Sequence, residues 1–264
     1  MLQINNLQKV FNKDTINEKV IFNNLNLHLN KGDFITVIGS NGAGKSSLLN
    51  LISGSILPDK GSICLNGRNI SSLPEHKRTK FIGRVFQDPT LGTSPSMSIL
   101  ENLSMAYNKG SKFGLTPGIN NKNLELFKES LSRLSLGLEN NLNKKVGLLS
   151  GGQRQALSLL ISTISNPDLL LLDEHTAALD PKTSENIIKL TKNTVSEKNI
   201  TTLMITHNLN YAIDIGNRLI MLHGGEIVLD ISGEEKKSLT IPKLLDRFNN
   251  KNSNDFISDE VAFS

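Results

Sequence analysis

The chain has 264 residues, of which 38% are hydrophobic and 20% charged, a composition typical of a globular protein. No apolar run approaches the roughly 18 residues that span a bilayer, and the start of the chain lacks the pattern of a signal peptide, so we expect a cytoplasmic protein. The net charge of +4 comes from scattered lysines, which favours a solvated surface and gives no indication of a nucleic-acid partner. The single cysteine, Cys64, cannot form an internal disulfide and is interpreted as a structural strand residue.

A glycine-rich stretch lies between the apolar run 34–38 and the helical pattern Leu48, Leu49 and Ile52. It matches the P-loop G-x-x-x-x-G-K-[ST] and consists of Gly39, Ser40, Asn41, Gly42, Ala43, Gly44, Lys45 and Ser46. The glycines let backbone N–H groups crowd around phosphate oxygens, and the helix that follows points its N-terminus at the same anion. Lys45 is predicted to pair with the β- and γ-phosphates of ATP, Ser46 to bind Mg²⁺, and Ser47 to offer one more hydroxyl.

Along the chain, residues 2–4, 10–11 and 20–29 alternate as antiparallel strands do, and turn residues punctuate a hairpin around 62–65. A short helix is predicted from Pro74, followed by a buried strand over 81–86. Residues 90–148 lose the strand pattern and show helical spacing, interrupted by a loop over 110–118. A helix from about 151 to 164, strands over 169–172 and 201–206, a hairpin over 219–229 and an amphipathic segment over 239–248 complete the core. The polar stretch beyond is expected to be mobile.

The sequence Leu149-Ser150-Gly151-Gly152-Gln153 resembles the signature of the ATP-binding subunits of ABC transporters, and the P-loop precedes it at the distance that this family shows. The resemblance covers about residues 2–230. It implies an α/β fold: a P-loop NTPase core with a mainly parallel sheet, an antiparallel β subdomain and an inserted α-helical signature subdomain. The expected cassette is 1–248, with the core at about 1–89 and 165–230 and the helical lobe at about 90–164; a polar tail, 249–264, follows.

The resemblance also assigns roles to single residues. Four buried leucines lead into Asp173 and Glu174, which look like Walker B: Asp173 beside Mg²⁺, and Glu174 polarising the attacking water. Gln87 matches the glutamine that contacts the metal or water, and His207 the histidine that reaches the γ-phosphate. Phe11 matches the aromatic residue that stacks on adenine. Read alone, Gln87 is more often a turn residue and His207 more often a structural histidine. For Phe11 the alternative is a core side chain, and adenine stacking is the favoured interpretation.

The signature implies a dimer. In this family Ser150, Gly151, Gly152 and Gln153 open a helix that caps ATP held by a second subunit, and Asp180 lies in the loop that touches that subunit. We therefore expect a homodimer, or a pair with a close paralogue, through the P-loop and signature faces. Integral-membrane permease subunits are the expected partners, with a solute-binding protein acting through the permease. The protein itself is expected to be peripheral on the inner face of the cell membrane. Two positions depart from the family pattern: His175 stands where proline is usual, and Ser47 where threonine is commoner.

Three functions follow from these motifs. The first is the ATPase subunit of a bacterial importer for an amino acid or another small solute. A split-subunit exporter of lipid or lipoprotein would carry the same motifs, and so would a soluble ABC ATPase such as an assembly factor. A module that binds nucleotide without hydrolysis is disfavoured because Glu174 and His207 are both present.

Overall fold

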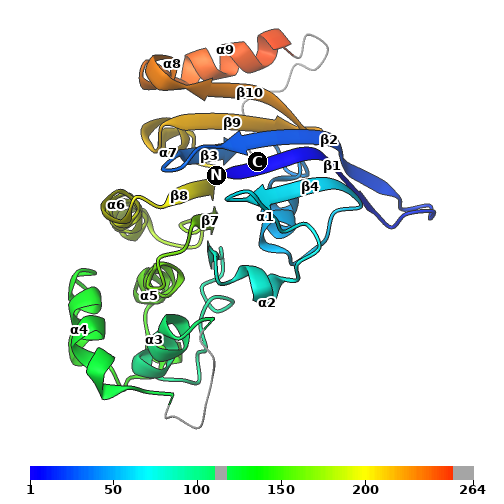
Figure 1. The fold of residues 1–264 in the computed structure, drawn as a ribbon. Helices are drawn as coiled ribbons and strands as arrows, with labels where there is room; N and C mark the ends of the chain where they lie inside the picture. The colour runs from blue at the N-terminus through cyan, green and yellow to red at the C-terminus, as the bar shows by residue number, and fades with distance from the viewer. Residues whose placement is uncertain (111–117, 252–264) are drawn as a thin grey trace. The chain divides into compact units, whose positions relative to one another are not determined.

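The computed structural model describes residues 1–110 and 118–251, whose packing divides them into two units. The first unit is built from Met1–Arg78 and the chain from Thr201 onward, and the second from Thr79–Ile200 (Figure 1). The second unit thus includes more of the chain than the predicted lobe of about 90–164. The predicted limits of core and lobe stay a prediction. Most of the predicted loop over 110–118, and the tail beyond 251, lie outside the described residues.

The first unit contains an antiparallel sheet in the order β2-β1-β4-β5. Its strands are β1 (Leu2–Phe11), β2 (Lys19–Leu29), β4 (Lys60–Leu65) and β5 (Arg68–Asn69). Alternate residues Leu2 and Ile4 on β1, and Leu27 and Leu29 on β2, are buried, as the period of two in the sequence predicts. Asn66 and Gly67 link β4 to β5 with φ of 50° and 77°, the left-handed geometry of a two-residue hairpin.

Strands of the first unit also form a mainly parallel layer in the order β10-β9-β3-β8. These are β3 (Phe34–Ile38), β8 (Thr201–Ile205), β9 (Arg218–His223) and β10 (Glu226–Ser232); β3 runs parallel to β8 and β9, and β10 pairs antiparallel with β9. Both β3 and β8 are buried along their whole length, as continuous apolar runs in parallel strands predict.

The helices in the described part of this unit are α1 (Lys45–Ser53), α2 (Glu75–Arg78), α7 (Leu209–Asp214), α8 (Gly233–Lys237) and α9 (Ile241–Lys251). The predicted amphipathic segment over 239–248 is confirmed by α9, which buries Leu244 and Phe248 against β9 and β10 residues such as Met221 and Leu229.

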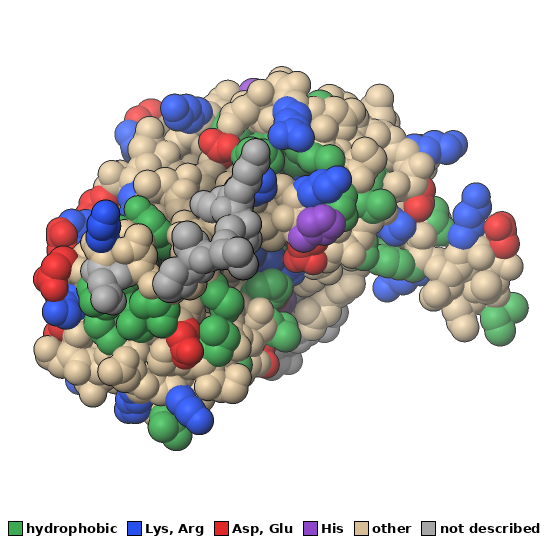
Figure 2. Space-filling model, turned by 60° about the horizontal axis from the view of Figure 1, so that its bottom comes forward, with side chains coloured by type: hydrophobic (Ala, Val, Ile, Leu, Met, Phe, Trp, Pro, Cys, Tyr) green, Lys and Arg blue, Asp and Glu red, His purple; other side chains and the backbone are tan. Residues whose placement is uncertain are grey.

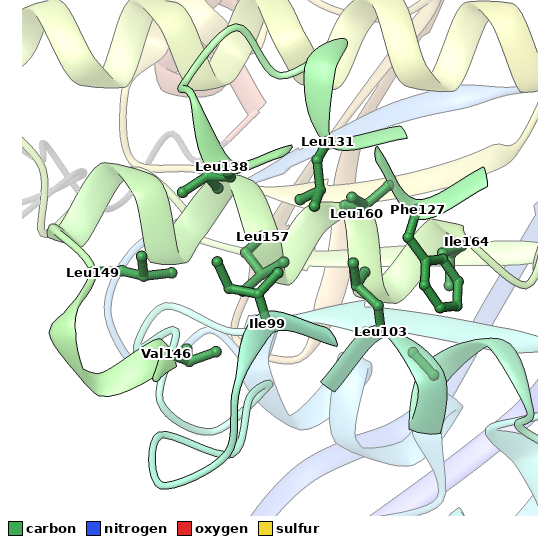
Figure 3. Close-up of a cluster of buried hydrophobic side chains, with 11 residues drawn as sticks. Ile99, Leu103, Phe127, Leu131, Leu138, Val146, Leu149, Leu157, Leu160 and Ile164 are labelled. Carbon is green, nitrogen blue, oxygen red and sulfur yellow. The ribbon is translucent and has the colours of Figure 1, made fainter. Parts of the chain in front are cut away.

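The second unit combines two parallel strands with helices. Its elements are β6 (Ile82–Val85), α3 (Ile99–Tyr107), α4 (Leu124–Ser132), α5 (Gly151–Thr163), β7 (Leu169–Asp173) and α6 (Pro181–Lys198), with short 3₁₀ turns η1 (Asn121–Asn123), η2 (Leu138–Asn140) and η3 (Val146–Leu148). The helical spacing of the sequence is confirmed by the core of this lobe, in which Ile99 and Leu103 of α3 face Leu157 and Leu160 of α5 (Figure 3). Phe127 and Leu131 of α4 complete the core.

Candidate nucleotide-binding site

The P-loop is shaped by glycines that no other residue could replace without strain. Gly39 follows β3 with φ of 148°, and Gly44 is the N-cap of α1 with φ of 101°. A Cβ at Gly39 would lie 2.1 Å from the backbone oxygen of Leu222, and one at Gly44 would lie 2.8 Å from the ring of Phe22. The loop can take this path only with glycine at both places.

The P-loop buries the amino group of Lys45, whereas other positions of the loop are exposed to solvent. Lys45 is 6% exposed, and its Nζ donates to the backbone oxygens of Gly39 at 2.6 Å and Ser40 at 3.0 Å. Gly42 and Ser46 are exposed. A buried ammonium, the N-terminus of α1 and a loop with exposed positions are the features that a site for a phosphate chain requires.

His207 lies at the same edge of the sheet as the P-loop. It directly follows β8, which runs parallel to β3, and the N–H of Thr206 donates to the backbone oxygen of Val37 at 3.2 Å. The structure therefore brings His207, the predicted γ-phosphate contact, and the P-loop to neighbouring strand ends within the first unit.

Phe11, the predicted adenine-stacking residue, is half-buried at the end of β1, where it pairs with Lys19 of β2. The Nζ of Lys9 lies 5.6 Å from the centre of its ring. Lys19 was not among the predicted site residues. Its Nζ lies 3.8 Å from the position that a Cβ of Gly42 would occupy, so β2 adds an exposed cation beside the P-loop. This proximity depends on the strand pairing, which no local motif encodes.

In the second unit, β6 and β7 bring the remaining polar groups to one edge. The strands are parallel with Val85 opposite Leu172, so Gln87 and the pair Asp173 and Glu174 follow neighbouring strand ends. Gln155 of α5, 1% exposed, donates from Nε2 to the backbone oxygen of Phe86 at 3.3 Å. The signature helix α5 thus holds the segment that carries Gln87.

Asp173 has a cationic neighbour that the sequence analysis missed. Arg84 of β6 places Nη2 at 3.1 Å from Oδ2 of Asp173, with side chains 11% and 15% exposed. The guanidinium also lies over the ring of Phe86, 4.5 Å from its centre. An arginine inside an otherwise apolar strand sequence, Phe81-Ile82-Gly83-Arg84-Val85-Phe86, was the available signal, because a buried charge requires a partner.

Glu174 and His175 have unusual environments. Glu174 has φ of 44°, in the left-handed region that few residues other than glycine adopt. His175 is 2% exposed, and its Nε2 lies 3.1 Å from Oγ1 of Thr191 on α6. Burial lowers the pKa of His175 from its ordinary 6.5 to about 4, so its ring is neutral at physiological pH.

The signature sequence opens helix α5, as predicted. Ser150 is the N-cap: its Oγ accepts from the N–H of Gln153, and Oε1 of Gln153 accepts from the N–H of Ser150, both at 3.2 Å. Gly152 is needed by packing, because a Cβ there would lie 2.4 Å from Cγ2 of Thr183 on α6. These contacts give Ser150, Gly152 and Gln153 structural roles within the subunit. Their contact with nucleotide stays a prediction.

Asp180 caps α6 by accepting from the N–H of Thr183 at 3.1 Å, and hydrogen bonds to Thr183 hold the pKa of Asp180 below its usual value. The starts of α5 and α6 border one open cavity of about 650 Å³, whose lining includes Ser150, Gly152 and Asp180. The signature residues Ser150 and Gly152 and the predicted subunit-contact residue Asp180 therefore border the same cavity within the second unit.

One protein family and two related proteins match the sequence of this chain. The profile of the ABC transporter family matches residues 22–177. A tyrosine transport ATP-binding protein of Clostridioides difficile is 52% identical over 94% of this chain and 98% of its own length. A phosphonates import ATP-binding protein of Oceanobacillus iheyensis is 34% identical over 87% of this chain and 89% of its own.

Among solved structures, the ATP-binding cassette MJ0796, described as a dimer in a post-hydrolysis state with bound ADP and phosphate, superposes with a TM-score of 0.75. It is 29% identical and covers 88% of this chain and 98% of its own. The fold, the P-loop and the family match over more than half of the sequence agree: the chain belongs to the ABC transporter family, as an ATP-binding subunit that hydrolyses ATP.

Proposed function

We propose that this protein is the energy-coupling ATPase of a bacterial importer for an amino acid, with tyrosine the first solute to test. The observation that carries the ATPase part is the P-loop, in which Lys45 and the start of α1 form a phosphate site that only glycines at 39 and 44 permit. The solute is supported by the tyrosine transport relative, which is 52% identical along nearly the whole chain.

In this proposal, Lys45 binds the β- and γ-phosphates of ATP, Phe11 stacks on adenine, and Ser47 adds a hydroxyl to the phosphate site. Glu174 accepts the proton of the attacking water, and His207 contacts the γ-phosphate. Ser46, Gln87 and Asp173 are the candidate ligands of Mg²⁺, and hydroxyl, amide and carboxylate oxygens are the donors that this hard cation prefers. When bound, Mg²⁺ would neutralise charge on the β- and γ-phosphate oxygens.

The same proposal includes a two-fold dimer in which the signature of each subunit faces nucleotide held by the other. It is supported by the cavity that Ser150, Gly152 and Asp180 border, and by the dimeric state described for the cassette MJ0796. The N-terminus of α5 carries the partial positive charge that a γ-phosphate would complement.

Apolar side chains on the second unit support docking to a permease. Leu91 is 69% and Leu148 68% exposed, and their segments are joined by the N–H of Gly147, which donates to the backbone oxygen of Pro95 at 2.9 Å. Figure 2 shows hydrophobic side chains gathered on the face that comes forward from the bottom of Figure 1, where α3 and α4 lie. No helix in the described part of the chain is long and apolar enough to cross a membrane. The exposed apolar side chains support our proposal that the protein acts on the cytoplasmic face of the membrane, bound to separate permease subunits.

The test is a mild-detergent pull-down of tagged Glu174→Gln protein with ATP from its native host. Recovery of a multi-helix permease with this variant, and ATP-dependent tyrosine uptake by vesicles that contain the same permease with the wild-type subunit, would support the proposal. Leu91→Asp should reduce permease recovery, while Ile16→Asp, at a fully exposed site on the first unit, should leave it unchanged. Recovery of only soluble partners would favour an assembly factor, and ATP-dependent loss of lipid from the vesicles would favour an exporter.

A further inference from the structure

The residue after Glu174 is a fully buried histidine. Its surroundings are set by α6, whose Thr191 is 1% exposed and lies opposite the ring. A buried imidazole is costly unless its nitrogen finds a partner, and the 3.1 Å contact between Nε2 of His175 and Oγ1 of Thr191 provides one. The sequence departs from the family pattern at this position, and the site as proposed above gives His175 no part.

The direction of this hydrogen bond follows from the proton count of Thr191. Its hydroxyl has one proton, which it donates to the backbone oxygen of Ile187, one turn earlier on α6, at 2.8 Å. Oγ1 is therefore the acceptor toward the histidine, and Nε2 of His175 must carry a proton. The contact fixes one tautomer and one ring orientation.

A second contact ties the same loop to α6. Oγ of Ser184, two turns before Thr191, donates to the backbone oxygen of Thr176 at 3.1 Å. The loop itself closes in a turn, because the N–H of Ala177 donates to the backbone oxygen of Glu174 at 2.9 Å. Residues 174–177 are thus held to one helix by a side chain at 175 and by the backbone at 176.

Glu174 needs such support because its backbone has a positive φ of 44°. A residue other than glycine keeps this conformation only where its neighbours determine it. We propose that His175 is a positioning residue, which through its hydrogen bond to Thr191 anchors the chain directly after Glu174 and so orients the Glu174 carboxylate toward the attacking water. This inference rests on the role proposed for Glu174 in hydrolysis.

The test compares Thr191→Val, which removes the acceptor at nearly equal volume, with Thr191→Ser, which keeps the hydroxyl. Because a neutral hydrogen bond contributes about 0.5–1.5 kcal/mol, we expect kcat of Thr191→Val to fall about two- to tenfold. KM and the Kd for a fluorescent ATP analogue should stay at the wild-type values, since the P-loop is untouched. Thr191→Ser should retain the wild-type kcat.

Nitrogen-15 NMR of labelled histidine gives a readout that does not depend on hydrolysis. The wild-type His175 spectrum should show a protonated Nε2, and its chemical shift should move in Thr191→Val and not in Thr191→Ser. An unprotonated Nε2 in the wild type, or an unchanged kcat in folded Thr191→Val, would overturn the proposal. Wild-type turnover by Glu174→Gln would instead refute the role of Glu174, and the NMR result would still report the His175 contact.

Discussion

Replacing Arg84 by methionine removes the only cation that the described contacts place on Asp173, while keeping much of the side-chain volume. At the observed 3.1 Å, two unit charges in a medium of effective dielectric constant 20 attract by about 5 kcal/mol, which is a ceiling. The side chains are 11% and 15% exposed, so water screens part of this attraction. We expect Arg84→Met to lower the free energy of unfolding by about 2–3 kcal/mol, and Tm by about 4–10 °C.

The assay is chemical denaturation of the nucleotide-free protein in a double-mutant cycle with Asp173→Asn. If the two groups act as a pair, the double variant is more stable than the sum of the single losses predicts, by about 2 kcal/mol. Lys128→Met, which breaks the exposed pair of Lys128 with Glu125 in the same unit, is the control and should cost less than about 1 kcal/mol. Simple additivity of Arg84→Met and Asp173→Asn would refute the reasoning.

Three further changes test other parts of the structure. Arg78→Met removes a buried guanidinium that donates to the backbone oxygens of Leu51 and Ile52, and should destabilise the protein by about 2–4 kcal/mol in urea unfolding, with unchanged stability contradicting that role. Gly44→Ala places a methyl group 2.8 Å from the ring of Phe22 at a φ of 101°; equilibrium dialysis should show loss of ATP binding, and wild-type affinity would contradict the steric argument. His175, neutral in the folded protein with a pKa of about 4 against 6.5 unfolded, makes the unfolded state take up more protons as pH falls below 6.5. Wild-type stability should therefore drop by about 2 kcal/mol more than that of His175→Gln between pH 7.5 and 5, and parallel pH profiles would contradict this.

Local patterns in the sequence predicted much of the architecture. The apolar runs at 34–38, 169–172 and 201–206 form parallel strands, and Ser150 begins helix α5, as expected because continuous apolar runs and helix-capping residues are patterns that can be recognised in adjacent residues. Helix α6 had no counterpart among the predicted elements, although Asp180 and Pro181 form a good helix start. Its buried face is narrow and its composition polar, so the periodic signal is weak.

The contacts that the sequence did not predict share a different cause. Arg84 contacts Asp173 across 89 positions of sequence, and His175, which the sequence singled out without a role, contacts Thr191 across 16. Lys19 reaches the P-loop only because β2 pairs with β1. Such contacts depend on strand order and helix packing, which the residue pattern constrains only loosely. The residues within the P-loop, and those within Walker B, are consecutive in the chain, so each motif can be recognised from the sequence.

We infer that ATP hydrolysis by this chain depends on Lys45 to bind phosphate and on Glu174 to activate water. This inference is tested most directly by phosphate release from Mg²⁺–ATP, measured beside nucleotide binding, for the wild type, Lys45→Ala and Glu174→Gln. Lys45→Ala should lose both nucleotide binding and turnover. Glu174→Gln should bind ATP, elute as a dimer on size exclusion, and release phosphate at least about a hundredfold more slowly than the wild type. Phosphate release by Glu174→Gln at the wild-type rate would contradict the inference.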